Sequence, residues 1–85
     1  MINVRCVGHI ATAMGSSELE VEGDDIEAAE LIERLRTMSG KAEPGFTKFN
    51  TLVVVEDGEA YVSASGDRRV KAGDSVVLIP FSHGG

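Results

Sequence analysis

The chain has 85 residues, which is enough for one domain with a thin hydrophobic core and too few for a deep substrate cavity, so a self-contained enzyme is not expected. Fourteen acidic residues against eight basic ones give a formal net charge of −6, and this charge excludes nucleic acids and anionic membranes as partners. One cysteine allows neither an internal disulfide nor a cysteine-based zinc cluster, and without a signal-peptide or membrane-span pattern a cytoplasmic protein is expected.

Residues 2–10 alternate between apolar and polar side chains, which predicts a strand with one buried face. Cys6 falls on the apolar face and His9 on the polar face, so we expect a core thiol and a surface histidine rather than a nucleophile and a metal ligand. After a Gly-Ser-Ser turn, residues 18–22 alternate again, with Leu19 and Val21 predicted to point into the core.

The next segment changes to a helical period. Asp24, followed three residues later by Glu27, resembles an acidic capping box, and apolar residues then recur every three or four positions. The pattern predicts one amphipathic helix from Asp25 to Met38 that ends at a Ser-Gly pair. Its predicted core residues include Leu31, Ile32 and Leu35.

The rest of the chain reads as strands separated by turns. Residues 51–56 form a strand, Asp57-Gly58 is a hairpin signal, residues 59–63 return as a short strand, and residues 75–79 form the last strand before Pro80. Gly66-Asp67 and Gly73-Asp74 are further turns. Five strands and one main helix can bury themselves only as a mixed sheet curled around the helix. The sequence therefore predicts an α+β fold of the β-grasp, ubiquitin-like type.

The strands at residues 52–55 and 76–79 are apolar at every position rather than at alternate ones, so both faces of the sheet carry hydrophobic side chains. The helix covers one face. Either the connection over residues 41–50 folds across the other face with Phe46 and Phe49, or a partner protein covers it. The candidate docking face on these strands consists of Ile79, Val77, Val55 and Val53.

The chain reaches two glycines directly after the last strand, so we divide it into a β-grasp domain over residues 1–81 and a flexible tail over residues 82–85. A terminal glycine presents the least hindered acyl carbon for conversion to an acyl adenylate. Gly84 and Gly85 also lack Cβ atoms, which lets an extended tail enter a narrow tunnel in another enzyme. The partner-binding tail is expected to include Pro80, Phe81, Ser82, His83 and Gly84. Phe81 either anchors the partner or closes the end of the core.

Residues 72–85 (AGDSVVLIPFSHGG) and residues 50–58 (NTLVVVEDG) resemble the ubiquitin-like sulfur-carrier family, and the resemblance covers essentially the whole chain. The family includes the small subunit of molybdopterin synthase (MoaD), the thiamine-pathway carrier (ThiS), archaeal small modifiers and the ubiquitin-related modifier. Pro80-Phe81 stands where molybdopterin-type members carry two prolines, and the His-Gly-Gly end resembles the ubiquitin-related modifier. Chain length and the Ile79-Pro80 step favour the molybdopterin type, but they do not decide to which branch of the family the chain belongs.

The resemblance implies that an E1-like adenylating enzyme uses ATP to activate Gly85, and that a sulfur donor converts the adenylate into a thiocarboxylate. The large subunit of molybdopterin synthase, or another sulfur-acceptor enzyme, then takes the sulfur. The catalytic groups belong to these partners, so the resemblance implies a carrier rather than an enzyme, with no bound cofactor and no metal site. The alternatives are a protein modifier joined to target lysines, a carrier for thiamine synthesis or tRNA thiolation, and a docking module whose tail is never activated.

Overall fold

The computed structural model describes residues 1–65 and 68–81. Within these residues the elements are, in chain order, β1 (Ile2–Cys6), α1 (Gly8–Met14), β2 (Glu18–Val21), β3 (Asp25–Glu27), α2 (Ala28–Met38), β4 (Thr51–Val55), β5 (Ala60–Val62), β6 (Arg69–Lys71) and β7 (Ser75–Pro80). The predicted turn at Gly66-Asp67 and the predicted tail over residues 82–85 lie outside the described residues. None of the described helices is long and apolar enough to span a membrane.

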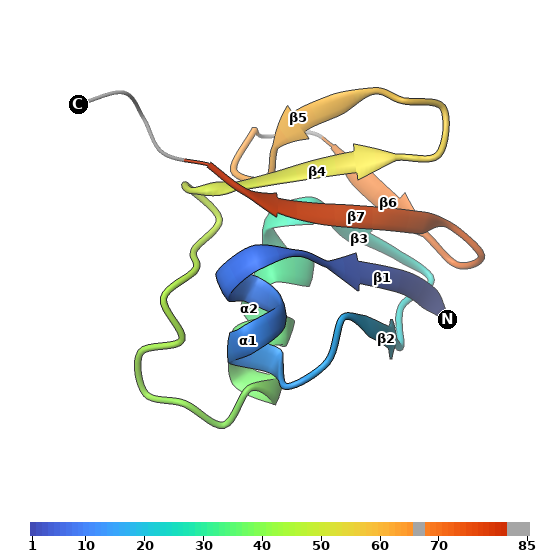
Figure 1. Ribbon diagram of the computed structural model, residues 1–85. Helices are drawn as coiled ribbons and strands as arrows, with labels where there is room; N and C mark the ends of the chain where they lie inside the picture. Colours follow the sequence, from blue (N-terminus) through green and yellow to red (C-terminus); the bar gives the residue numbers. More distant parts are fainter. Residues whose placement is uncertain (66–67, 82–85) are drawn as a thin grey trace.

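Five strands form one mixed sheet in the order β2-β1-β7-β4-β5, with β1 parallel to β7 and the other neighbours antiparallel (Figure 1). β3 and β6 form a second, two-stranded sheet. The predicted mixed five-stranded sheet packed against a main helix is confirmed, and it is the β-grasp architecture.

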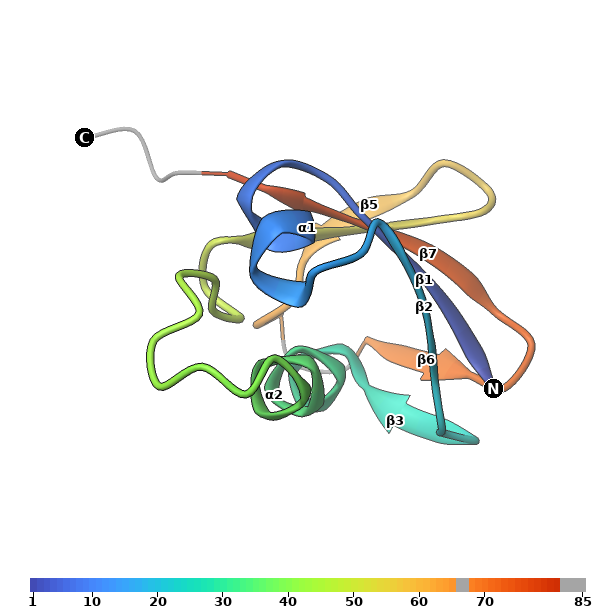
Figure 2. The ribbon, with the colours of Figure 1, turned by 60° about the horizontal axis from the view of Figure 1, so that its bottom comes forward.

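The hydrophobic core lies between the large sheet and α2, which covers one side of it (Figure 2). Leu31, Ile32 and Leu35 are fully buried, as the helical spacing predicts. Val21 is buried and Leu19 packs partly buried against the core, which confirms the inward side of β2. The sheet contributes alternate residues of its three central strands, namely Ile2, Val4, Cys6, Val53, Val76 and Leu78.

The prediction of a strand over residues 2–10 is wrong after Cys6, because the chain turns into α1 there. Gly8 has φ 61°, a left-handed conformation that ends the strand and that other residues adopt at a cost. Ile10 reaches the core from the helix rather than from the strand, and His9 lies exposed on α1. Gly15, with φ 74°, ends the helix, and its N–H donates to the carbonyl oxygens of the preceding turn.

The prediction that the main helix begins at Asp25 is also wrong, because β3 occupies its first three positions and α2 begins at Ala28. β3 pairs with β6, so Ile26 lies opposite Val70 and both side chains are buried. Glu27 occupies the N-cap position without a side-chain capping bond, so the predicted capping box does not form. Residues 25–27, which the local pattern assigned to the helix, instead form a strand because they pair with the distant segment β6.

The hairpin at Asp57-Gly58 is confirmed between β4 and β5, with Gly58 at φ 92° in the turn. The prediction that Pro80 stops the last strand needs one adjustment. Pro80 belongs to β7, opposite Thr51, and the next amide, that of Phe81, still donates to the Asn50 carbonyl at 2.9 Å. The strand is therefore tied to β4 up to Phe81, the last residue that the structure describes before the chain end.

Candidate docking face and chain end

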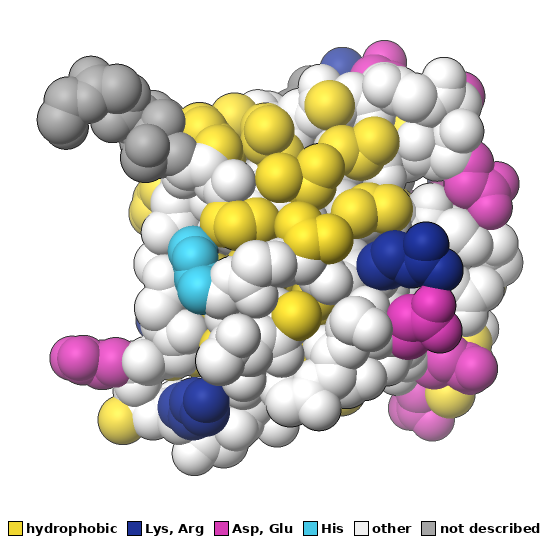
Figure 3. All heavy atoms as spheres, viewed as in Figure 1, with side chains coloured by type: hydrophobic (Ala, Val, Ile, Leu, Met, Phe, Trp, Pro, Cys, Tyr) yellow, Lys and Arg dark blue, Asp and Glu magenta, His cyan; other side chains and the backbone are white. Residues whose placement is uncertain are grey.

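The sheet face directed away from α2, here called the outer face, is apolar over β4 and β7. Because side chains alternate along a strand, the burial of Val53 and Leu78 directs their neighbours outward. Cross-strand register places Leu52 opposite Ile79 and Val54 opposite Val77, all partly buried. Val62 on β5 and Val7, just after β1, extend this surface, which we call the outer patch (Val7, Leu52, Val54, Val62, Val77 and Ile79). Figure 3 shows the hydrophobic side chains gathered over these strands.

Two of the four residues predicted for the docking face are on the wrong side. Val53 is 0% exposed and pairs with Leu78 inside the core. Val55 follows the same parity, lies opposite Val76 and packs against the core. Both parities of β4 are apolar, so sequence alone cannot say which side faces the helix, and a shift of one residue exchanges the faces. Leu52 and Val54 lie on the outer face instead, beside Val77 and Ile79 of the predicted set.

The connection over residues 41–50 does not cover the outer patch. Phe46 is fully buried and belongs to the same core cluster as α2, whereas Phe49 is 59% exposed. The alternative in which Phe46 helps the connection to cover the outer face is therefore wrong. The outer patch remains at the surface of the described molecule (Figure 3).

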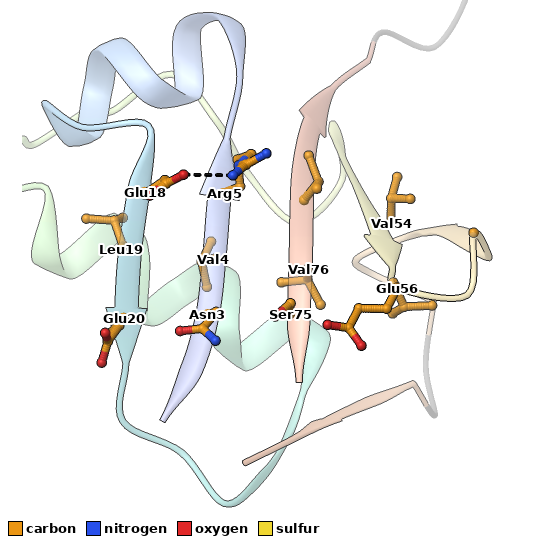
Figure 4. Close-up of a pocket in the computed structure, with 13 residues that line it drawn as sticks. Asn3, Val4, Arg5, Glu18, Leu19, Glu20, Val54, Glu56, Ser75 and Val76 are labelled. Atoms are coloured by element: carbon orange, nitrogen blue, oxygen red, sulfur yellow. Dashed lines mark hydrogen bonds and ion pairs between the residues drawn. The ribbon is translucent and has the colours of Figure 1, made fainter. Parts of the chain in front are cut away.

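The outer face becomes polar toward β2, where a shallow depression crosses β2, β1, β7 and β4 (Figure 4). Arg5 of β1 points toward Glu18 of β2, and its Nη2 lies 2.7 Å from Oε1 of that carboxylate. The register continues this polar surface with Glu20 beside Asn3 and with Ser75 on β7. An exposed ion pair adds about 1 kcal/mol or less to stability, so the Arg5–Glu18 pair contributes little to holding the sheet together.

The end of β7 is fixed by contacts with two other segments. Gly8 lies so close to Pro80 that an added Cβ would be 3.1 Å from the proline Cγ. On the other side, the Asn50 carbonyl accepts the hydrogen bond from the amide of Phe81, whose side chain is partly buried. Ser82, His83, Gly84 and Gly85 lie outside the described residues, so the predictions for the tail stay predictions.

Cys6 lies in the core, as its place in the alternating pattern predicts, and burial raises the pKa of its thiol. A buried thiol with a raised pKa is a poor nucleophile, so Cys6 does not provide a sulfur-transfer site. Within residues 1–65 and 68–81, no group of three His, Cys, Asp or Glu side chains is arranged to hold a metal ion.

Comparison with known proteins identifies the family. The model of the ThiS family matches residues 4–85, nearly the whole chain. The crystal structure of SAMP1 from Haloferax volcanii superposes with a TM-score of 0.65 at 19% sequence identity, covering 99% of this chain and 98% of that one, and shows the same fold. No curated protein sequence matches the chain. The family match spans both the β-grasp domain and the Gly-Gly end, and the chain belongs to the ThiS family of ubiquitin-like sulfur carriers.

Proposed function

We propose that this protein carries sulfur as a thiocarboxylate on Gly85. The observation that carries the proposal is the family match, which runs through the Gly-Gly pair to residue 85. A carboxylate oxygen of Gly85 attacks the α-phosphorus of ATP and pyrophosphate leaves. A persulfide sulfur then displaces AMP from the acyl carbon, and a thiol reductant cleaves the acyl disulfide to leave the thiocarboxylate. ATP is bound and used by an E1-like adenylating enzyme, in the cytoplasm.

In this proposal the protein supplies the reacting group and a docking surface, and its partners supply the catalytic groups. The outer patch supports docking because it is apolar, lies on a rigid sheet and continues toward the end of β7, where Ile79 precedes Pro80 and Phe81. A partner seated on the patch is therefore placed to receive the residues that follow Phe81. The Arg5–Glu18 pair at the polar end sets the orientation of that partner.

We propose molybdopterin synthase as the assembly that uses the sulfur, with this chain as its small subunit and a large subunit as acceptor. The support is the resemblance at Ile79-Pro80 and the chain length. Thiamine synthesis and tRNA thiolation use the same activated tail, so they differ only in the acceptor. A protein modifier begins from the same adenylate, which a target lysine attacks in place of sulfur.

The proposal is tested by exchange of radiolabelled pyrophosphate into ATP, catalysed by the organism's own E1-like enzyme in the presence of this protein. Full-length protein supports exchange, and a variant lacking Gly85 does not, because the attacking carboxylate is displaced from the active site. Normal exchange with the Gly85 deletion would show that the chain end is not the reacting group. The thiocarboxylated protein is then incubated with each purified acceptor candidate in turn. The candidate that consumes the sulfur identifies the pathway.

A further inference from the structure

Phe49 is an exposed aromatic residue at the entrance to β4. Its side chain is 59% exposed, while Phe46, three residues earlier, is fully buried. An exposed phenylalanine places a large apolar surface in water, and such residues are frequent energetic centres of protein interfaces when they are held in one position. The surrounding turn decides whether Phe49 is held in this way.

The turn over residues 47–50 is fixed by hydrogen bonds on both sides of Phe49. The Phe49 N–H donates to Oγ1 of Thr47 at 3.1 Å, and the Thr47 N–H donates to Oδ1 of Asn50 at 2.7 Å. Two buried hydroxyl groups complete the network: Thr51 donates to the Thr47 carbonyl at 2.8 Å, and Ser63 donates to the Lys48 carbonyl at 2.7 Å. The backbone that carries Phe49 is therefore preorganised, so a partner that binds the ring has little backbone ordering to supply.

The turn also lies beside the end of β7. Asn50, the residue after Phe49, accepts the hydrogen bond from the amide of Phe81, and Phe81 is the last residue before the chain end that the structure describes. The Lys48 ammonium lies 5.4 Å from the centre of the Phe49 ring and adds a positive charge at this place in a chain of net charge −6. An enzyme that binds the residues after Phe81 has to approach this corner of the molecule.

We propose that Lys48 and Phe49 form a second docking contact, separate from the outer patch, for the enzyme that adenylates the tail. The Phe49 ring enters an apolar pocket near the mouth of that enzyme's active site, and a carboxylate at the rim of the pocket pairs with Lys48. This inference rests on the proposed function. It adds that the enzyme recognises the chain by a fixed aromatic residue beside the tail as well as by the sheet.

The test compares Phe49→Ala with Met38→Ala in pyrophosphate exchange by the organism's own E1-like enzyme. Met38 is a matched control because its side chain is 51% exposed but lies at the end of α2, away from the end of β7. Phe49→Ala is expected to raise the KM for the carrier about tenfold or more while kcat changes less than about twofold. Met38→Ala should leave both within about twofold, and Phe49→Tyr should restore most of the affinity.

Two further measurements separate docking from other effects. Both alanine variants should melt within a few degrees of the parent protein, and calorimetric titration into the enzyme without ATP should show the same loss of affinity for Phe49→Ala. Lys48→Glu should weaken binding at low salt and less at high salt. A KM for Phe49→Ala equal to that of the parent, or equal losses in both alanine variants, would overturn the inference alone. A parent protein that supports no exchange would overturn the proposed function as well.

Discussion

Val53 and Val54 are adjacent on β4 and should differ in how much stability and how much affinity they lose on the same substitution. Val53 is 0% exposed and packs in the core, while Val54 points to the outer face. Replacing either one by alanine removes the same two methyl groups, and in a strand the cost of that change depends on the face and its burial. Any difference between the two variants therefore reports which side of the sheet each residue occupies.

The magnitude follows from burial. Two fully buried methyl groups are worth about 1.6 kcal/mol of transfer free energy, and the cavity left beside Leu78 and Tyr61 raises the loss for Val53→Ala to about 2–3 kcal/mol. At Val54 the burial is partial and water fills the space, so the expected loss is below about 1 kcal/mol. For a domain of this size, the Val53→Ala midpoint should fall by about 10–20 °C, and the Val54→Ala midpoint by only a few degrees.

Urea unfolding followed by circular dichroism measures the stability difference, since the chain has no tryptophan. The second half of the experiment measures the KM of each variant in pyrophosphate exchange at a temperature where both are folded. Val54→Ala should raise the KM because the outer patch has lost contact area, and Val53→Ala should leave it unchanged. Equal destabilisation of the two variants, or a KM effect confined to Val53→Ala, would refute the assignment of the faces.

Three other perturbations have defined outcomes. Gly8→Ala should destabilise the protein by about 2 kcal/mol or more in thermal melting, because φ is 61° and the new Cβ meets Pro80. Gly15→Ala, with φ 74° and open space around the new Cβ, should lose about 1 kcal/mol of stability. A larger loss for Gly15→Ala than for Gly8→Ala would contradict the packing of Gly8 against Pro80. Deleting Gly85 should leave the melting temperature within about 1 °C while abolishing adenylation. Cys6, whose pKa burial raises, should react with a disulfide reagent at pH 8 only after urea unfolds the chain, and rapid labelling of the folded protein would disprove its burial.

The parts of the fold that the sequence predicts are those with a strong local period. Leu31, Ile32 and Leu35 recur on one face of a helix, and the Asp57-Gly58 turn joins two apolar strands, so local physics alone specifies both. The sequence does not reveal α1, because this helix is only seven residues long and its residues continue the alternation of β1 as far as Ile10. Gly8 offers the only local signal for that break, through the positive φ that glycine tolerates.

Other features depend on residues far apart in the chain. β3 exists because Asp25–Glu27 pairs with Arg69–Lys71, and the Arg69 Nε lies 2.7 Å from Oδ1 of Asp25, a contact that no local window contains. The choice between Val53 and Val54 for the outer face is of the same kind, since it is set by the register with β7. The Gly-Gly end, by contrast, is a chemical signal that the sequence shows directly.

The most direct test of sulfur carriage is top-down mass spectrometry of the protein after incubation with ATP, its E1-like enzyme and a persulfide donor. If Gly85 carries the sulfur, one oxygen is exchanged for one sulfur, fragmentation places the exchange on Gly85, and omitting ATP prevents it. An unmodified Gly85 under complete conditions, or added sulfur located on Cys6, would contradict sulfur carriage on the chain end.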